Sequence, residues 1–414
     1  MLENRSVNRN DTEDLPVRGD SMKILIYSRA FPPLIGGTET IVMLLARGLS
    51  EFRDAMSKDR PVITVVTPTP AATRDIDLPF RLVRKPSLRT LIRLFREADV
   101  IHIAGPSLLA VALGLFLQKT VVVEHHGFQT ICPNGQLLHQ PTQTQCPGHF
   151  MAKRHRECIR CNLKMGKLNS LKMWLLTFPR RWLCQNVSGN IFPTEWLGKI
   201  LLLKNGVTIH HGIPDGGDPI TENALTMPTF TFVGRLVSTK GAQVFLVAAR
   251  LLRGRSPTFR LKIIGDGPDR EALEKLVGDF DLQDCVEFSG YCSPEQVEKT
   301  LKQTTALVVP SLAGEVFGLV VLENMLRKKC LIVSDIPSLQ EVIGDTGLVF
   351  PAGDAEALAS CMSQILQAPS LATSMGLAAR NRAVQVFPLE SMLKAHLSVY
   401  REVSLHLPLD GRAE

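Results

Sequence analysis

Short apolar runs alternate with stretches of helical periodicity along most of the chain. The earliest run, Met22–Ser28, is rich in β-formers and predicts a buried parallel strand. A Pro-Pro and a Gly-Gly turn then lead into residues whose apolar positions have helical spacing. Later runs predict further strands at Val62–Thr67, Val100–Ile103, Val121–Glu124 and Gly189–Phe192. Strand, glycine turn and helix in this order are typical of the start of a doubly wound α/β fold.

A second β/α series follows a segment rich in Pro and Gly, residues 212–228, which is the predicted linker. Its strands are expected at Phe230–Val233, Arg260–Ile264, Val286–Ser289, Ala306–Val309, Leu331–Val333 and Leu348–Val349. Its helices are expected at Ala242–Leu252, Pro268–Val277, Pro294–Gln303 and Gly318–Lys328. Two such series predict an α/β protein with two Rossmann-like, doubly wound parallel-sheet domains. Ligands of such sheets bind at the carboxyl ends of the strands, so we expect the site in a cleft between the two domains.

The length of 414 residues exceeds what one hydrophobic core ordinarily organises, which also favours two domains. We expect a disordered tail at 1–21, then an N-terminal domain at 22–212 that contains a cysteine-bearing insertion at 128–165. A C-terminal domain is expected at 213–386. The final segment, 387–414, is predicted to form a helix that crosses back to the first domain.

Composition favours a globular protein of a reducing compartment. Hydrophobic residues make up 45% and charged residues 21% of the chain, and neither figure indicates disorder. The most apolar run, Leu108–Leu117, is far shorter than the roughly 18–20 residues that span a bilayer, and it predicts a buried helix. The N-terminus lacks the apolar core of an export signal, so we expect a cytoplasmic protein whose nine cysteines are free thiols or metal ligands rather than disulfides.

Charge is distributed unevenly within the net total of +7. Residues 1–211 carry 28 basic against 16 acidic side chains, and the remainder carries 19 against 24. The stretch 151–183 is strongly basic, and aromatic and leucine side chains are interleaved with its charges. This mixture suits peripheral contact with an anionic membrane surface or with an anionic acceptor. A solvated helical face over a partly buried aromatic cluster fits the same pattern.

The segment 310–326 carries the strongest chemical signal. A predicted strand ends at Pro310, a loop presents Glu315, and a helix begins near Phe317. Free backbone N–H groups and the dipole of a helix start bind phosphate. Glu323 lies eight residues after Glu315, at most roughly 12 Å along a helix axis. That span allows one carboxylate to reach a hexose and the other a ribose, with pyrophosphate between them.

Two further turns follow predicted strands of the second half. VGRLVSTKG, residues 233–241, places Arg235 and Lys240 just beyond a strand end, where two cations can neutralise a departing diphosphate. IIGDGP, residues 263–268, places Gly265 in a tight turn but lacks a complete dinucleotide-binding fingerprint.

Four cysteines lie close together in the predicted insertion: Cys132, Cys146, Cys158 and Cys161. Four thiols can close a tetrahedral zinc site or hold an iron–sulfur cluster, and so stabilise a long loop. Only the last pair has C-x-x-C spacing, so the alternative of free thiols stays open.

Seven segments, taken in order, resemble the retaining glycosyltransferases of family 4, also called glycosyl transferases group 1, which have the GT-B fold. They are FPPLIGGTE, HHGF, IHHGIP, FVGRLVSTKG, IIGDGP, VEFSGY and PSLAGEVFGLVVLENM. The resemblance extends from Lys23 to about Phe387, and its second half is the more specific part.

The resemblance implies roles for individual residues. Arg235 and Lys240 would hold the donor diphosphate, Glu315 the hydroxyls of the transferred sugar, and Glu323 the ribose. The remaining positions implied near the donor are Gly36, Gly37, His126, Gly265, Tyr291, Phe317, Gly318, Leu319 and Glu341. Tyr291 would border the nucleobase together with Cys292, and Glu341 is the least secure because Ser338 and Leu339 replace the glycines common in relatives.

A function follows from the resemblance as an expectation. A hexose or N-acetylhexosamine would pass from a nucleotide diphosphate sugar to a glycan or lipid-linked acceptor, with retention and with no cofactor required for catalysis. No nucleic acid partner is expected. Two alternatives stay open: a basic binding protein stabilised by metal, and a GT-B enzyme that epimerises or hydrolyses its nucleotide sugar.

Overall fold

The computed structural model describes most of the chain. The described residues are 21–52, 60–71, 77–216, 227–255, 258–407 and 409. The predicted tail, apart from Ser21, and much of the predicted linker, 217–226, lie outside the described residues.

A seven-stranded sheet organises the first half of the chain, with strand order β3-β2-β1-β4-β5-β8-β9 and every pair parallel. Its strands are β1 Lys23–Ser28, β2 Val62–Thr67, β3 Arg81–Arg84, β4 Val100–Ala104, β5 Thr120–Glu124, β8 Gly189–Phe192 and β9 Gly206–Thr208. Alternate residues of β1 enter different cores: Ile24 and Ile26 join one cluster, and Leu25 and Tyr27 join the other. The sheet is therefore covered on both faces, which explains why its strands are continuous apolar runs.

Helices of the first half fill these two layers. They are α1 Gly37–Glu51, α2 Leu88–Glu97, α3 Leu108–Phe116, α5 Lys167–Cys184 and α6 Glu195–Leu201. The helix predicted from the most apolar run exists as α3, but the expectation that it is buried was wrong in part. Ala110 and Val111 are buried, whereas Phe116 is 83% exposed because it lies on the outer face.

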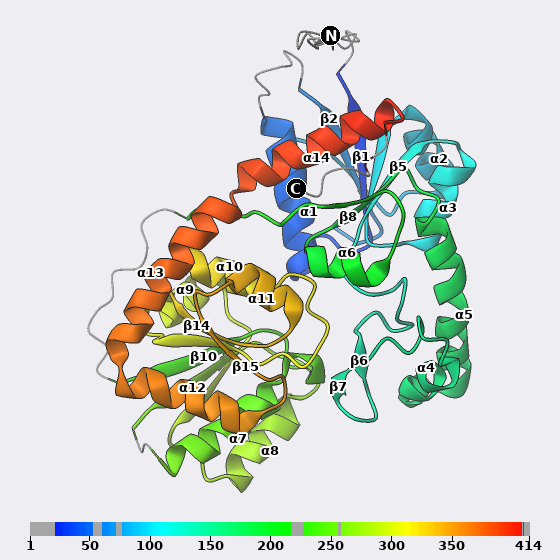
Figure 1. Ribbon diagram of the computed structural model, residues 1–414. Coiled ribbons are helices and arrows are strands. Elements are labelled where there is room, and N and C mark those ends of the chain that lie inside the picture. The colour runs from blue at the N-terminus through cyan, green and yellow to red at the C-terminus, as the bar shows by residue number, and fades with distance from the viewer. Residues whose placement is uncertain are drawn as a thin grey trace, which may run out of the picture.

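A long excursion separates β5 from β8. It contains the short antiparallel strands β6 Leu138–His139 and β7 Thr144–Gln145, then α4 His155–Cys161 and the 3-10 turn η1 Leu163–Met165. The chain then enters α5, which runs along the outer edge of the first domain (Figure 1).

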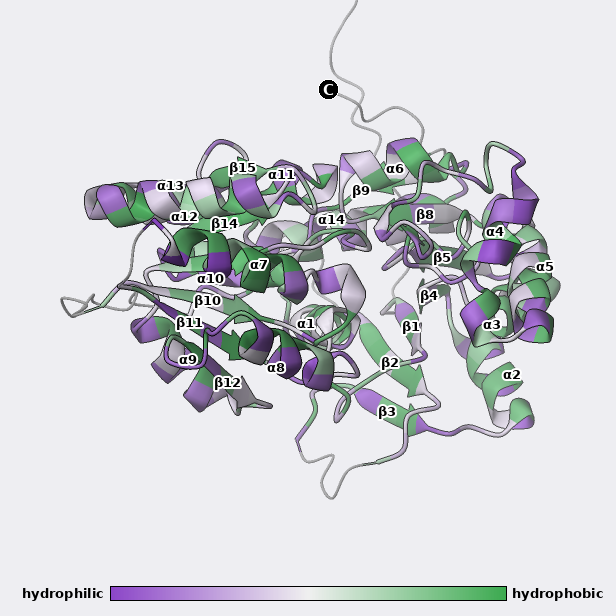
Figure 2. Ribbon diagram, turned by 90° about the horizontal axis from the view of Figure 1, so that it is seen from below, coloured by the Kyte–Doolittle hydropathy of each residue, from purple (hydrophilic) through white to green (hydrophobic). Residues whose placement is uncertain are grey.

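A six-stranded parallel sheet organises the second half, with order β12-β11-β10-β13-β14-β15. Its strands are β10 Thr229–Val233, β11 Arg260–Ile264, β12 Val286–Gly290, β13 Ala306–Val309, β14 Cys330–Ser334 and β15 Leu348–Phe350. Its helices are α7 Ala242–Arg253, α8 Arg270–Asp279, α9 Pro294–Lys302, α10 Leu319–Leu326, α11 Pro337–Ile343, α12 Ala355–Gln367 and α13 Pro369–Val386, and the 3-10 turn η2 is Ser238–Lys240. Neighbouring strand residues again face opposite cores, since Ala306 packs with α7 and Leu307 packs with α10. α7 is mostly apolar, and α8 and α9 contain more polar stretches (Figure 2).

Two segments join the halves side by side. The final helix, α14 Leu389–Ser404, leaves the second half and packs across the first sheet, where Tyr400 is buried in the same cluster as Ile24 (Figure 1). Just before it, Pro388 forms a β-bridge with Ile213 of the linker. A Cβ on Gly212 would lie 2.6 Å from the Pro388 carbonyl oxygen, so only glycine allows this close approach.

The predicted fold class is confirmed: two doubly wound parallel sheets face each other as Rossmann-like halves. Within the part of the chain that the structure describes, no helix combines the length and apolarity needed to cross a bilayer.

Candidate active site

Three loops meet at the carboxyl ends of neighbouring strands of the second sheet. They follow β10, β11 and β13, which are adjacent in the order β11-β10-β13. A Cβ on Gly265 would lie 1.9 Å from the Gly234 carbonyl oxygen, and a Cβ on Gly241 would lie 1.8 Å from that of Pro310. Both glycines also have positive φ, at +135° and +69°. Glycine is therefore required where the loops touch backbone to backbone.

Lys240 and Glu315 meet directly in this group of loops. Lys240 Nζ lies 2.6 Å from Glu315 Oε1, which also accepts a hydrogen bond from Ser311 Oγ at 2.7 Å. Ser338 Oγ donates to the backbone carbonyl of Glu315 at 2.8 Å. The Glu315 side chain is only 8% exposed, whereas that of Lys240 is 33% exposed and lies at the edge of the cleft. Hydrogen bonds thus hold Glu315 in place, and the Lys240 ammonium beside it is more exposed.

The start of α10 presents unpaired backbone donors beside this pair. Gly318, at φ +89°, precedes the helix and fixes the turn into it. Among the described residues, none accepts a hydrogen bond from the amides of Phe317, Gly318 or Leu319. Gly37, at the start of α1, lies across from them, since a Cβ there would be 3.4 Å from Leu319 Cδ1. The glycine turn of the first domain and the helix start of the second therefore face each other.

The Phe317 side chain does not point into the cleft. It is 1% exposed and packs against the rings of His211, at 5.0 Å between centroids, and Phe387, at 5.6 Å. Only its amide is available to a ligand.

Arg235, Glu323 and Tyr291 lie near the same edge but do not contact the Lys240–Glu315 pair. Arg235 is exposed two residues after β10, and no described residue pairs with its guanidinium. Tyr291 follows β12 and is 66% exposed. Glu323 lies in the second turn of α10, and burial raises the pKa of its carboxyl although Arg327 opposes the shift.

His126 belongs to a buried group of polar side chains at the carboxyl edge of the first sheet. Glu124, the last residue of β5, is fully buried, and its Oε2 lies 3.4 Å from His126 Nε2 and 3.2 Å from His102 Nε2. Tyr400 of α14 bonds the other nitrogen of His102 at 2.9 Å. Within the described residues, Glu124, His126 and His211 are the one set that brings three ligand-type atoms within 4.8 Å of one another.

Segments that join the domains complete this group. His211, directly before the linker, and His396 of α14 approach Glu124 Oε1 at 3.6 and 3.7 Å. Burial alone would raise the pKa of Glu124, but the surrounding imidazoles hold it well below its ordinary value. Burial lowers the pKa of His211 to about 3. Sequence reasoning found His126 and missed the other members, although the HH pairs at 125–126 and 210–211 are a visible signal.

Glu341, which the resemblance implied near the nucleotide, contacts the start of α6 in the first domain. Its carboxylate accepts hydrogen bonds from the backbone amides of Glu195 and Trp196, at 2.7 and 3.1 Å, and contacts His210 Nε2 at 2.9 Å. Although burial opposes it, these contacts lower the pKa of the Glu341 carboxyl. Glu341 therefore caps α6 of the other domain, as a negative charge at a helix start does.

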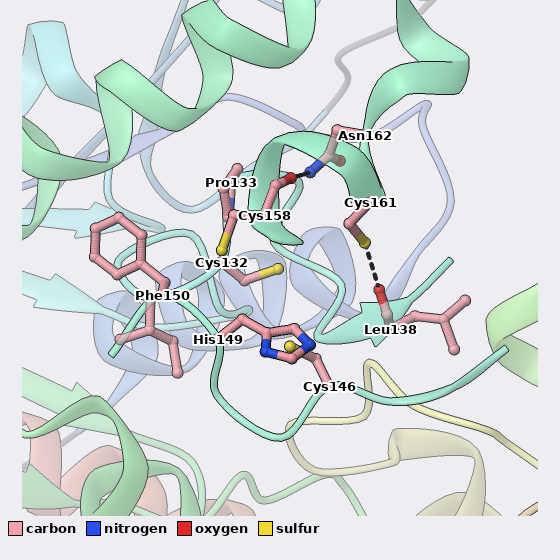
Figure 3. A pocket seen from close by; sticks show the side chains of 10 residues that line it. Cys132, Pro133, Leu138, Cys146, His149, Phe150, Cys158, Cys161 and Asn162 are labelled. Atoms are coloured by element: carbon pink, nitrogen blue, oxygen red, sulfur yellow. Dashed lines mark hydrogen bonds between the residues drawn. The ribbon is translucent and has the colours of Figure 1, made fainter. Parts of the chain in front are cut away.

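The four predicted cysteine ligands surround one small cavity in the insertion (Figure 3). Burial raises the pKa of Cys132 to about 11 and that of Cys158 to about 12. The four sulfurs are farther apart than the ligands of one bound metal ion, since no three of them lie within 4.8 Å of one another.

Comparisons with known proteins relate the second half of the chain to one family. Residues 219–382 match the family described as glycosyl transferases group 1. The chain is 31% identical to alpha-D-kanosaminyltransferase of Streptomyces kanamyceticus over 180 aligned residues. The alignment covers 43% of this chain and 46% of that protein. It is 28% identical over 232 residues to D-inositol 3-phosphate glycosyltransferase of Corynebacterium urealyticum, covering 52% of this chain and 54% of that protein. The aligned part thus spans about half the length of these curated relatives.

Solved structures share the fold over almost the whole chain. Sucrose-phosphate synthase of Thermosynechococcus elongatus has a TM-score of 0.68 at 20% identity, covering 92% of this chain and 99% of that one. Anabaena Alr3699/HepE, solved in complex with UDP and glucose, has a TM-score of 0.67 at 14% identity, covering 92% and 99%. Residues 219–382 thus match the glycosyl transferases group 1 family, within a chain that has the GT-B fold over almost its whole length.

Proposed function

We propose that this protein is a retaining glycosyltransferase that moves a hexose or N-acetylhexosamine from a nucleotide diphosphate sugar to a glycan or lipid-linked acceptor. The observation that carries the proposal is the edge formed by the Lys240–Glu315 pair and the open amides at the start of α10. A diphosphate matches that edge, because amides and a lysine supply donors and positive charge while the adjacent carboxylate accepts from sugar hydroxyls.

Donor binding has to change the partner of Lys240. Its ammonium now contacts Glu315, and a diphosphate beside the amides of Gly318 and Leu319 would offer it a second anion. Glu315 keeps the hydrogen bond from Ser311 and is therefore held for sugar hydroxyls. Arg235, exposed at the neighbouring loop, is the second cation within the same group of loops.

The proposed transfer with retention involves no covalent intermediate with the protein. The bond from the anomeric carbon to the diphosphate oxygen breaks, the acceptor oxygen bonds to the anomeric carbon from the same face, and the acceptor proton passes to the departing phosphate oxygen. The residues contribute by positioning both substrates and by stabilising the charge of the leaving group. His126, held by Glu124 beside the linker, is the proposed contact to the donor sugar from the first domain.

A panel of nucleotide sugars tests the donor. We expect one or two of them, with UDP-glucose as the first probe because Alr3699/HepE holds UDP and glucose, to raise the thermal midpoint of the wild-type protein. Lys240→Ala should abolish the shift, and Lys275→Ala, an exposed lysine of α8, should retain it. Equal shifts for all three proteins would remove the proposed edge from donor binding.

Product analysis separates transfer from the alternatives. Incubation of the stabilising donor with and without a glycan or lipid-linked acceptor should give a glycosylated product only when acceptor is present. Release of free sugar, or an epimerised nucleotide sugar, without acceptor would instead indicate a hydrolase or epimerase.

We further propose that α5 docks the first domain on an anionic bilayer, where a lipid-linked acceptor would be presented. Five apolar side chains recur along one side of this helix at spacings of three and four residues, and all are exposed: Leu168, Leu171, Leu175, Phe178 and Trp182. Lys167 and Lys172 are exposed beside this stripe. An apolar stripe with flanking lysines matches an interface of acyl chains and anionic headgroups.

Two of the basic residues counted in the sequence do not belong to that surface. Arg180 donates to the carbonyl oxygens of Pro106 and Gln129, and Arg181 donates to those of Leu201 and Leu202. They tie α5 to its own domain.

Vesicle sedimentation tests the docking face. The full chain should bind vesicles of phosphatidylglycerol and phosphatidylcholine more tightly than vesicles of phosphatidylcholine alone. Leu175→Ser should weaken that binding several-fold, and Leu377→Ser on α13 should not, although both leucines are 51% exposed. Equal binding of both variants would refute a specific role for α5.

A further inference from the structure

The cysteine insertion contains a cavity to which three separate segments of chain contribute cysteines. Cys132 lies in the turn after β5, Cys146 follows β7, and Cys158 and Cys161 lie on α4. All four line one cavity of about 10 Å³, together with His149 (Figure 3). The other five cysteines of the chain do not line it. Four of the nine thiols therefore gather around one small space. This arrangement favours the binding of a ligand by sulfur over simple apolar packing of cysteine side chains.

Two of these sulfurs form hydrogen bonds with the insertion itself. The backbone amide of Gln140 donates to Cys161 Sγ at 3.3 Å. The Cys161 thiol itself donates to the Leu138 carbonyl oxygen at 3.4 Å, and the Cys132 thiol donates to Asn134 Oδ1 at 3.1 Å. Both thiol bonds disappear on deprotonation, because a thiolate has no proton to donate. The sulfurs are then free to turn toward the cavity, and the amide contact remains.

The insertion needs an internal link. Its two strands have two residues each and α4 has seven, so regular hydrogen bonding stabilises little of the segment between β5 and α5. Long connections without much secondary structure are uncommon in compact domains unless they are functional or cross-linked.

From the four sulfurs around one cavity, we infer that Cys132, Cys146, Cys158 and Cys161 bind a single structural zinc ion. Zinc takes four thiolates tetrahedrally at about 2.3 Å, which sets the sulfurs about 3.8 Å apart. The sulfurs therefore have to move closer together when the ion binds, and the loops that carry Cys132 and Cys146 allow this adjustment. Binding of Zn²⁺ forms four Zn–S bonds and releases four protons, with no change of oxidation state.

Local charge favours the resulting anionic centre. A zinc with four thiolates carries two negative charges, and the segment that supplies Cys158 and Cys161 also carries Arg154, Arg156 and Arg160. The only acid within this segment, 151–164, is Glu157. Cations around the site offset the charge of the ligands.

The ion would fix a wall of the interdomain cleft. Leu138, whose carbonyl contacts Cys161, is fully buried in the core cluster of the second domain with Leu312 and Ala313. Gly314 approaches the Gln136 carbonyl oxygen, since a Cβ there would lie 3.2 Å away. The zinc therefore holds the loop that packs against the segment carrying Glu315. Its presence does not depend on the proposed sugar transfer.

Metal analysis of the full chain, purified without an affinity tag that binds metal and without chelator, tests this inference. We expect about one zinc per chain and little iron. Cys158→Ser should reduce zinc at least several-fold. Cys361→Ser, a buried cysteine of α12, and His149→Ala, which removes the non-sulfur group at the cavity, should both retain it.

Cobalt substitution keeps the test valid if Cys158→Ser fails to fold. Wild-type protein refilled with Co²⁺ should show the intense visible absorption of tetrahedral cobalt–thiolate coordination, and zinc should displace it. Zinc-free wild-type protein with all four thiols reactive, iron with inorganic sulfide, or a disulfide within the insertion would each overturn the inference. Loss of zinc in His149→Ala would replace the four-sulfur set by one that contains histidine.

Discussion

The two halves share one architecture and use the carboxyl edges of their sheets in opposite ways. In the second half, the edge at β10, β11 and β13 exposes amides, Arg235 and Lys240, which are the groups proposed to bind the donor. In the first half, the end of β5 is filled by Glu124 and its imidazole neighbours. α14 and the segment directly before the linker supply part of that group, so this edge joins the domains instead of remaining open.

The two edges differ in how they surround a carboxylate. Glu124 is fully buried among imidazoles of both domain-crossing segments, and Glu315 is 8% exposed beside a lysine that faces the cleft. A carboxylate enclosed on all sides contributes to stability, whereas one with a displaceable partner contributes to binding. Mutations at the two positions should therefore separate stability from turnover.

The largest effect is expected from Glu124→Ala. The variant removes a buried carboxylate whose pKa the surrounding imidazoles hold low, and breaking such a buried group costs about 3–5 kcal/mol of unfolding free energy. Urea unfolding followed by circular dichroism measures the loss. Glu390→Ala, which removes an exposed pair with Lys394 on α14, should change stability by less than about 1 kcal/mol. Comparable losses in both variants would show that the buried group does not hold the domains.

Lys240→Ala should lower turnover by about 10²–10³-fold, equivalent to roughly 3–4 kcal/mol of transition-state stabilisation, with the fold intact. The reason is loss of positive charge beside the departing diphosphate. Steady-state kinetics with the donor identified by the panel measures the effect, and circular dichroism checks the fold. Near-normal transfer would exclude Lys240 from the site, and the exposed Lys275→Ala should behave as wild type.

Acid should weaken the first half before the second. His211 and His125 are buried, and burial lowers their pKa values to about 3 and about 4. Between these values and about 6.5 the unfolded chain binds protons that the folded chain does not, so stability falls as pH falls. Each histidine contributes up to about 1.4 kcal/mol per pH unit within its window.

Unfolding free energies measured from pH 7.5 downward check that slope. His211→Asn should make it shallower, and substitution of the exposed His406 by Asn should leave it unchanged. A slope that does not respond to His211→Asn would place the acid sensitivity elsewhere.

The smallest effect is expected from Glu341→Ala, at about 1 kcal/mol, because the variant removes a cap at the start of α6. Hydrogen exchange should accelerate at the Glu195 and Trp196 amides, and the thermal midpoint should fall slightly. Glu341→Gln keeps an acceptor oxygen and should lose less. If the variant changed donor binding but did not accelerate hydrogen exchange at these amides, Glu341 would instead be part of the nucleotide site.

Sequence patterns located most strands because both faces of each sheet are covered, which makes the strands continuous apolar runs. Val62–Thr67, Gly189–Phe192 and Arg260–Ile264 coincide with β2, β8 and β11. The exceptions within the two parallel sheets, β3 and β9, lie at the edges of the first sheet and have no fully buried residue. Their local signal is weak since edge strands pack on fewer neighbours.

The candidate site also has a part that local sequence patterns predict and a part that they do not. The donor-side motifs are local: Arg235 to Lys240 and Glu315 to Glu323 each lie on one strand–loop–helix unit, so spacing alone relates their members. The group around Glu124 combines β4, β5, α14 and the segment directly before the linker, and His102 and Tyr400 are 298 residues apart. No periodicity relates residues that meet only when both domains have packed.

The sequence by itself determined the two β/α series, the loops that follow their strands and the presence of four clustered cysteines, because these depend on local periodicity and short spacing. Tertiary structure decided the rest. It paired Lys240 with Glu315, buried the Phe317 ring, turned Glu341 into a cap for the opposite domain and placed four thiols around one cavity. The physical reason is that partners for buried charges and rings are chosen by packing between distant segments, and a linear pattern does not contain that information.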